Sequence, residues 1–226
     1  GNIEELKGYI SEVASDLAAF IFEPLIQGAG GMQMYEAQYL DELILHCKKN
    51  GILTIADEVM TGFGRTGKLF ASDYLSEQAD LMCFSKGLTG GTMALGVTTC
   101  TSAIYNAFLS DDKLKTLFHG HSFTANPVAC SAALASLDLL LHKETINNIE
   151  RITQSHHEFR NKIKDQQKLK NIRQTGTILA LEWESTGETS YFNNLRDKLY
   201  TFFLDQGIIL RPLGNILYVL PPYCIS

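Results

Sequence analysis

The sequence predicts an α/β protein, with part of a large domain followed by a smaller C-terminal α+β domain. In the first 142 residues, continuous apolar runs typical of buried strands alternate with segments of helical periodicity. We therefore expect a mostly parallel sheet with helices on both faces. After about residue 142 the pattern changes to polar helix, strand, helix and strand. We place the domain boundary there, giving residues 1–142 and 143–226.

The large domain is predicted element by element from its periodicity and its breaks. The helix at 35–51 repeats apolar residues at Leu40, Leu43 and Ile44, and Gly51 ends it. A later helix begins with Asn126 as N-cap and Pro127 in its first turn. In chain order, we expect a helix at 2–17, a buried strand at 18–24, the helix at 35–51, strands at 52–56, 81–85 and 94–101, and a helix at 126–141.

The smaller domain is predicted to be shorter and more polar. We expect the chain to be a fragment lacking a substantial N-terminal part and a short C-terminal part, because few strands precede this domain. Its expected elements are a helix at 144–167, one strand at 172–183, a helix at 190–206 and one strand at 208–222.

Composition excludes several classes of function. The chain has 226 residues and a net charge of -6, without a cluster of lysines and arginines, which argues against nucleic acid or an anionic membrane surface as a partner. The five cysteines are odd in number and scattered, and no C-x-x-C occurs. They predict buried thiols in a reducing compartment, without a disulfide framework or zinc site, and we expect a cytoplasmic enzyme.

A glycine-rich run, TGFGRTGK, follows two acids at the end of a predicted strand. Residues 62–68 fit the phosphate-binding pattern G-x-x-x-x-G-K-[ST] up to its last position, where Leu69 replaces the hydroxyl residue. In a phosphate-binding loop the glycines follow the strand directly, whereas Asp57 and Glu58 intervene here. The mismatch argues against a nucleotide site and directs attention to the acids.

Asp57 and Lys86 each stand at the carboxyl end of a predicted strand, which is where α/β sheets collect ligands. A solvated lysine has a pKa of ~10.4, so a nucleophilic lysine needs desolvation or a nearby cation. With pyridoxal phosphate as cofactor, Asp57 would keep the pyridine nitrogen protonated and Lys86 would bind the aldehyde. From spacing alone, a loop-capping Asp57 and a solvated surface Lys86 remain an equal alternative.

Three motifs in order resemble one known family. The runs FEPLIQGAGGM (22–32), LTIADEVMTGFGRTGKLFA (53–71) and SKGLTGG (85–91) are similar to the class III aminotransferases, which are pyridoxal phosphate enzymes of fold type I. The resemblance extends from about Phe20 to the end of the chain. It implies that the large domain is part of a fold type I transferase domain and that the cofactor is pyridoxal 5'-phosphate.

The resemblance also implies roles for single residues. Lys86 corresponds to the lysine that binds the cofactor and moves the substrate proton, and Asp57 to the partner of the ring nitrogen. Val59 corresponds to the residue that packs on the ring, a role compatible with an ordinary core valine. Glu23 corresponds to a glutamate that orients its neighbours, and the glycine run becomes a backbone-fitting loop beside the cofactor.

A narrower resemblance concerns the substrate. The runs KGLTGGTMALGVTTCT, HGHSFTANPVACSAALASL and LRPLGNILYVLPPY are similar to the branch that aminates 8-amino-7-oxononanoate to 7,8-diaminononanoate in biotin biosynthesis, with S-adenosylmethionine or lysine as donor. In that branch the residue matching Arg211 binds the substrate carboxylate, a task suited to a guanidinium. A surface arginine before a proline is the alternative.

The segment HGHSF is expected to act across a homodimer. His119 and His121 stand two apart, but no third ligand candidate lies near them in the sequence, which argues against a metal site. The resemblance places Gly120 near the substrate, and His121 and Ser122 at the cofactor phosphate of the opposite subunit. Relatives usually have proline and threonine at the latter two positions, so Ser122 keeps the hydroxyl donor and the role of His121 stays open.

Two alternative hypotheses about function remain. One is a class III aminotransferase for an ω-amino acid such as ornithine or 4-aminobutyrate, against which Met60 and Arg211 weigh. The other is a catalytically inert piece, because the family's phosphate-gripping loop and ring-stacking aromatic precede this segment. Binding of pyridoxal phosphate that depends on Lys86 distinguishes a working pocket from an inert piece.

Overall fold

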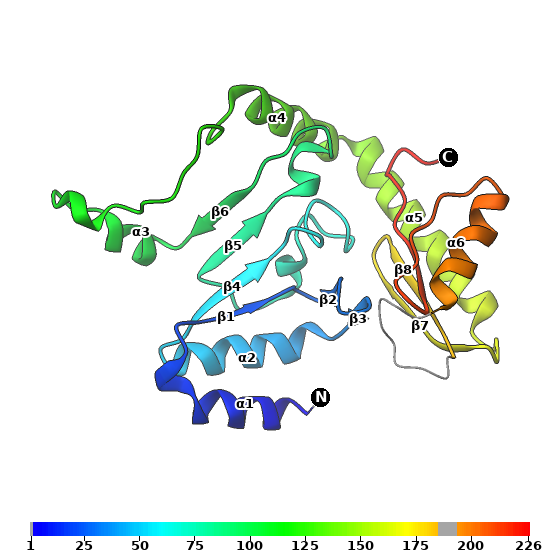
Figure 1. Cartoon of the computed structure of the whole chain (residues 1–226), viewed down its shortest axis with the longest axis horizontal. Coiled ribbons are helices and arrows are strands. Elements are labelled where there is room, and N and C mark those ends of the chain that lie inside the picture. Colours follow the sequence, from blue (N-terminus) through cyan, green and yellow to red (C-terminus); the bar gives the residue numbers. More distant parts are fainter. Residues whose placement is uncertain (1, 185–193) are drawn as a thin grey trace.

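The first sheet has four strands in the computed structural model, which describes residues 2–184 and 194–226. Across the sheet, their order is β1 (Ala19–Phe22), β4 (Leu53–Asp57), β5 (Leu81–Phe84) and β6 (Val97–Cys100). Strands β1, β4 and β5 are parallel, and β6 pairs antiparallel with β5 (Figure 1). The mostly parallel α/β sheet predicted from the apolar runs is therefore confirmed.

Helices α1 (Ile3–Glu12) and α2 (Ala37–Lys49) lie together beside this sheet (Figure 1). The predicted apolar stripe of α2 is buried, and Ile44 packs with Phe22 and Ala56 of the sheet. Helix α2 ends as expected, since Gly51 adopts the left-handed conformation (φ 70°) that favours glycine after a helix. Helix α1 packs mainly on α2, where Ile10 shares a buried cluster with Leu43 and Cys47.

The face of the sheet opposite α2 is exposed to solvent in the described part of the chain, and so are its two edges, at strands β1 and β6. Ile21 of β1 is 61% exposed and Leu53 of β4 is 42% exposed. All four residues of β6 are exposed, so the prediction of a buried strand at 94–101 was wrong on burial. The reason is position: β6 is an edge strand, and no described segment pairs with its outer side.

Short elements that the apolar pattern did not predict surround the sheet. The run LIQGAGGMQM forms a small hairpin, because Gly31 and Met32 adopt positive φ and turn the chain back. These elements are the strands β2 (Ile26–Gln27) and β3 (Gln33–Met34), the helix α3 (Ser102–Phe108), and 3₁₀ helices at Ala14–Asp16, Ala71–Tyr74, Lys86–Thr89 and Lys113–Lys115.

Residues 109–125, called the arm below, link α3 to α4 (Pro127–Leu141). Every residue of the arm is exposed, and Figure 1 shows it extending away from the sheet. The predicted start of α4 is confirmed, because the Asn126 side chain accepts hydrogen bonds from the N–H groups of Val128 (2.9 Å) and Ala129 (3.4 Å). The predicted domain boundary falls at His142, between α4 and α5 (Lys143–Ile163), and the division itself stays a prediction.

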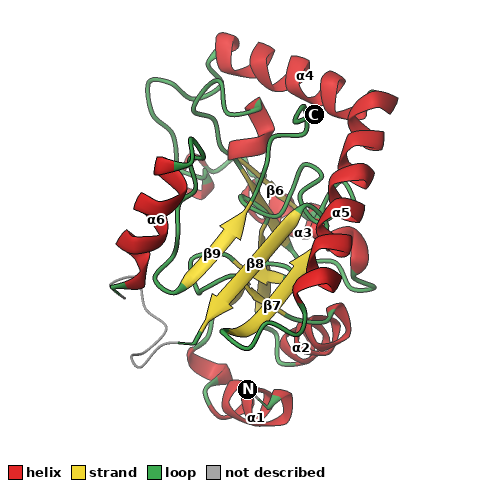
Figure 2. Cartoon of the chain, turned by 90° about the vertical axis from the view of Figure 1, so that its right-hand side faces the viewer, coloured by secondary structure: helices red, strands yellow, loops and turns green. Residues whose placement is uncertain are grey.

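The second sheet is antiparallel and has the order β7 (Leu169–Thr175), β8 (Ile178–Trp183) and β9 (Ile216–Val219). In Figure 2, α5 and α6 (Leu195–Asp205) flank the sheet, and both pack against the same buried cluster on one of its faces, Leu179, Leu181 and Leu217. The single strand predicted at 172–183 is a hairpin, because Gly176 (φ 53°) reverses the chain between β7 and β8. The strand predicted at 208–222 is confined to β9, since Pro212 and the turn at Gly214 precede it. The start of the helix predicted at 190–206 lies outside the described residues.

The two sheets are joined through the β2–β3 hairpin. Ile26 and Met32 pack in one buried cluster with Ile178 and Ile216. The buried Arg173 side chain donates to Glu182 Oε2 (2.5 Å) and to the carbonyl of Gly31 (3.0 Å). This link fixes the second sheet against the segment that follows β1.

Other sequence expectations concern the thiols and membrane segments. All five cysteines are free, and Cys47 is buried as predicted, but Cys100 and Cys224 are exposed. Cys100 is exposed because it lies on the open edge strand β6. Across the described residues, no helix combines the length and the apolar character needed to cross a membrane.

Candidate active site

The carboxyl ends of β4 and β5 bring Asp57 and Lys86 to the same edge of the sheet. The parallel register pairs Asp57 with Cys83, and the Glu58 N–H donates to the Cys83 carbonyl (2.9 Å). Asp57 is the last residue of β4, and Lys86 follows the last residue of β5 by two, so both predicted residues lie at neighbouring strand ends. The Asp57 Oδ1 accepts a hydrogen bond from the Val59 N–H (3.0 Å), which fixes the carboxylate at the turn.

Lys86 has an unusual backbone for a residue with a side chain. It opens the 3₁₀ helix Lys86–Thr89 with φ 44°, in the left-handed region, and its side chain is exposed. Such a conformation costs about 1–3 kcal/mol and persists where the surrounding structure enforces it, most often at functional sites. The backbone therefore marks Lys86 as a functional candidate independently of its chemistry.

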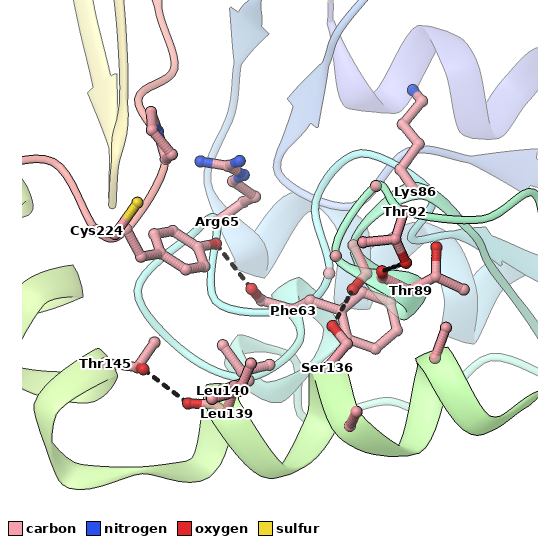
Figure 3. Close-up of a pocket in the computed structure, with 18 of the residues that line it drawn as sticks. Phe63, Arg65, Lys86, Thr89, Thr92, Ser136, Leu139, Leu140, Thr145 and Cys224 are labelled. Carbon is pink, nitrogen blue, oxygen red and sulfur yellow. Dashed lines mark hydrogen bonds between the residues drawn. The ribbon is translucent and has the colours of Figure 1, made fainter. Parts of the chain in front are cut away.

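A cavity of about 720 Å³ lies beside these strand ends. Its volume is in the range of small-molecule sites, about 300–1,000 Å³. Val59 and Lys86 both line it, whereas Asp57 is not among its lining residues. Figure 3 shows Lys86 extending away from α4, with Arg65 across the cavity. Its walls come from the glycine run after β4, the segment after β5, α4 and the C-terminal segment, and include Phe63, Gly87, Thr92, Ser136, Leu139 and Tyr223.

The glycine run and the four residues after it, residues 61–72 and called the glycine loop below, do not form a nucleotide-binding loop. No α-helix begins directly after Lys68, and the chain instead enters the 3₁₀ helix Ala71–Tyr74. The Lys68 Nζ donates to the Asp73 carbonyl (2.8 Å) and lies 4.3 Å from the centroid of the Tyr74 ring. Lys68 is thus engaged in the structure of the loop, as the order of elements in the sequence indicated.

The C-terminal segment holds the glycine loop through Arg65 and Tyr223, which the sequence did not reveal as partners. The Arg65 Nη1 donates to the Pro221 carbonyl (2.6 Å), and its guanidinium lies 4.7 Å from the centroid of the Tyr223 ring. The Tyr223 hydroxyl donates to the Phe63 carbonyl (2.7 Å), and burial raises the pKa of Tyr223 to about 12. About 160 residues separate these partners in the chain, so no local pattern connects them.

The β7–β8 turn holds the same loop from a second direction. Thr177 donates to the Arg65 carbonyl through both its N–H (3.0 Å) and its hydroxyl (3.1 Å). A β-carbon built on Gly176 would lie 2.2 Å from the carbonyl carbon of Thr66, so only glycine fits. The glycine loop therefore lines the cavity on one side and, on another, packs its backbone against the turn of the second sheet.

The structure does not bring the remaining predicted residues to the cavity. Gly120, His121 and Ser122 lie on the exposed arm, where the His121 Nδ1 accepts a hydrogen bond from the Phe123 N–H (3.1 Å). Arg211 is exposed in the segment before β9 and is not among the lining residues. Their predicted roles at the substrate and phosphate therefore stay predictions.

Glu23 lies near the strand ends without lining the cavity. Its Oε2 accepts a hydrogen bond from the Gly28 N–H, and its carbonyl accepts one from the Tyr35 hydroxyl. These contacts agree with the expectation that Glu23 orients its neighbours. Within residues 2–184 and 194–226, no three His, Cys, Asp or Glu side chains group closely enough to hold a metal ion.

The residues present fit an aldehyde cofactor such as pyridoxal phosphate. Lys86 lines the cavity and has an exposed side chain, and Asp57 supplies a carboxylate at the neighbouring strand end. Val59 and Phe63 add apolar walls on which an aromatic ring can pack. Lys86 would hold the aldehyde, and Asp57 would hold the ring nitrogen.

Comparisons with known proteins agree with this chemistry. Residues 2–226 match the family model "Aminotransferase class-III". The adenosylmethionine-8-amino-7-oxononanoate aminotransferase of Synechococcus elongatus is 45% identical over 213 residues, which are 94% of this chain and 50% of that protein. The chain therefore spans about half the length of the curated relatives it matches.

Solved structures show the same similarity in three dimensions. The crystal structure of the adenosylmethionine-8-amino-7-oxononanoate aminotransferase from Methanocaldococcus jannaschii superposes with a TM-score of 0.91 at 34% identity, covering 99% of this chain and 53% of that one. An omega transaminase from Pseudomonas jessenii, in complex with PMP, gives a TM-score of 0.89 at 28% identity, covering 99% of this chain and 51% of that one.

Proposed function

The chain belongs to the class III aminotransferases, and from this premise we propose that the whole protein aminates 8-amino-7-oxononanoate to 7,8-diaminononanoate in biotin biosynthesis. The observation that carries the proposal is the match of nearly the whole chain, at 45% identity, to a relative named for that substrate. We propose S-adenosylmethionine as the amino donor on the same ground, with lysine as the other candidate.

Each candidate residue has one task in this proposal. Pyridoxal phosphate supplies, when bound, an aldehyde that condenses with amines and a ring that takes up electrons from the substrate. The Lys86 amine holds the cofactor between turnovers and carries the proton to and from the reacting carbon. The Asp57 carboxylate keeps the ring nitrogen protonated, and Val59 orients the ring by packing on its face.

The arm supports a homodimer in which each active site is shared. Gly120, His121 and Ser122 lie on an exposed segment that extends away from the first sheet of their own chain (Figure 1). We propose that Ser122, with His121 beside it, donates to the cofactor phosphate of a second copy, and that Gly120 borders the substrate there. The Arg211 guanidinium is proposed to bind the substrate carboxylate. A cytoplasmic location is part of the same proposal.

The test uses the full-length protein with pyridoxal phosphate, 8-amino-7-oxononanoate and a panel of donors. We expect 7,8-diaminononanoate, detected by mass spectrometry, from the wild type and from the control Lys49→Ala, whose lysine is exposed in the last turn of α2. Lys86→Ala is expected to abolish the product. Amination directed to 4-aminobutyrate or ornithine partners, with the oxononanoate ignored, would contradict the substrate and favour an ω-amino-acid enzyme.

A further inference from the structure

Glu58, between Asp57 and Val59, is a carboxylate with no exposure to solvent. Its Oε1 accepts a hydrogen bond from the Ser72 N–H (2.6 Å). Its Oε2 accepts one from the Thr61 hydroxyl (2.6 Å) and one from the Ala71 N–H (3.1 Å). Burying a carboxylate is costly unless hydrogen bonds replace its hydration, and here three donors do so.

The three donors come from the two ends of the glycine loop. Thr61 is its first residue, and Ala71 and Ser72 are its last two. The main chain of Glu58 adds a fourth bond, because its carbonyl accepts from the Gly62 N–H (3.0 Å). Glu58 therefore closes the loop at its base and attaches it to the end of β4.

The closed loop presents Phe63 to the residue after Lys86. Phe63 is buried and has φ 59°, a second strained backbone at this site. A β-carbon built on Gly87 would lie 2.9 Å from both Cβ and Cδ2 of Phe63, so the phenyl ring rests directly on the Gly87 backbone. The Gly87 carbonyl also accepts a hydrogen bond from the Ser136 hydroxyl (3.2 Å; Figure 3).

We propose that Glu58 is a positioning residue for Lys86, acting through the glycine loop and Phe63. The carboxylate fixes both ends of the loop, the loop holds Phe63 on Gly87, and this contact keeps the Lys86 backbone left-handed and so sets the direction of its exposed side chain. The inference rests on the proposed function in one respect, namely that Lys86 is the residue that receives the cofactor.

The experiment compares full-length wild type with Glu58→Gln, which keeps the side-chain shape but turns one acceptor oxygen into a donor facing an N–H group. Glu77→Gln is the matched control, because Glu77 makes a partly exposed ion pair with Lys48 (2.9 Å) away from the loop. Two quantities are measured: the rate at which pyridoxal phosphate becomes attached to Lys86, trapped by borohydride and quantified by mass spectrometry, and backbone hydrogen exchange in cofactor-free protein.

We expect Glu58→Gln to slow attachment about 10- to 100-fold, since misplacing a reacting group by about 1 Å has effects of that size. Hydrogen exchange should accelerate in residues 61–72 and 85–90, and Glu77→Gln should change neither quantity. Faster exchange at 61–72 with wild-type attachment and unchanged exchange at 85–90 would overturn the proposal, because Glu58 would then serve the loop alone.

A second variant covers the case in which Glu58→Gln does not fold. Phe63→Leu leaves the three hydrogen bonds of Glu58 in place and shortens the side chain that reaches Gly87. We expect slower attachment with unchanged exchange at the loop ends, and wild-type attachment would overturn the proposal. If wild type attaches no cofactor at Lys86, the proposed function fails, and exchange at 85–90 alone decides whether Glu58 positions that segment.

Discussion

Tyr223 shows how a single buried hydroxyl ties the end of the chain to the cavity. Its phenol donates to the Phe63 carbonyl (2.7 Å), and burial raises its pKa to about 12 from an ordinary 10. Tyr223→Phe removes this hydrogen bond but keeps the ring beneath Arg65. We expect a loss of about 0.5–1.5 kcal/mol in the free energy of unfolding at neutral pH, measured by urea denaturation.

The same substitution has a predicted effect on pH dependence. A folded-state pKa above the unfolded value gives stability that is complete below pH 10 and is lost as the pH rises through about 12. Burial also raises the pKa of Tyr35 to about 12, so both phenols contribute to this alkaline loss. Tyr223→Phe should therefore make the loss between pH 10 and pH 12 smaller but not abolish it, and an unchanged slope would contradict the assignment.

At the candidate site, the sequence predicted where two residues lie in the fold. Asp57 and Lys86 were predictable because each follows a continuous apolar strand, and the parallel register then places both at one edge. The role proposed for Glu58 could not be predicted from the sequence. It depends on three hydrogen-bond donors that come together only when the loop is folded. Arg65 and Tyr223 were missed because their contact joins segments that are distant in the chain.

At the scale of elements, the backbone of the β7–β8 turn packs closely against the backbone of the glycine loop. Gly176 has φ 53°, and its missing β-carbon would meet the backbone of Thr66 and Gly67 at 2.2 and 2.5 Å. Gly176→Ala therefore adds a steric conflict to the cost of a left-handed alanine. We expect a loss of at least ~1–3 kcal/mol in the free energy of unfolding and faster hydrogen exchange at residues 63–67.

Gly51 supplies the matched control for this prediction. It also has positive φ (70°), but a β-carbon there meets nothing within 4 Å. Gly51→Ala thus measures the cost of the backbone conformation alone. Equal losses in the two variants, with unchanged exchange at 63–67, would show that the turn does not press on the loop.

Predictions of helices and strands succeeded where a periodic hydrophobic pattern extends over many residues. They failed where a single glycine reverses the direction of the chain. The stripe of α2 and the N-cap of α4 were found at their predicted places. The β7–β8 hairpin was predicted as one strand, because a lone Gly176 within an apolar run gives little periodic signal. The β2–β3 hairpin has two-residue strands, too short for an alternating pattern.

At the scale of the whole molecule, the apolar surface is distributed unevenly. The arm carries five large hydrophobic side chains that are each more than 60% exposed, whereas the two sheets meet in a closed core at Ile26, Ile178 and Ile216. The five are Leu109, Leu114, Leu117, Phe118 and Phe123. The sequence pattern predicts which residues are apolar, but burial depends on what packs against them, so the exposure of this arm was not predictable.

Contiguous exposed apolar side chains promote association in water. We expect the 226-residue chain to associate with itself in a concentration-dependent manner, observed by analytical ultracentrifugation. Leu114 (84% exposed) and Phe118 (80% exposed) contribute no packing to the described core. The double variant Leu114→Gln/Phe118→Gln should therefore weaken association at least about tenfold, while the free energy of unfolding changes by less than about 0.5 kcal/mol.

The edge strands offer a competing route to association, because no other strand among residues 2–184 and 194–226 pairs with the outer sides of β1 and β6. A β6 variant, Thr98→Pro, separates the two routes. Thr98 pairs with Cys83, whose carbonyl points to β4, so the Thr98 N–H lies on the open side of β6, where proline cannot donate to an added strand. If association persists in the arm variant and is lost in Thr98→Pro, the edge of the first sheet and not the arm is the self-associating surface. If the arm variant alone abolishes it, side-chain burial on the arm drives the contact, as its exposure predicts.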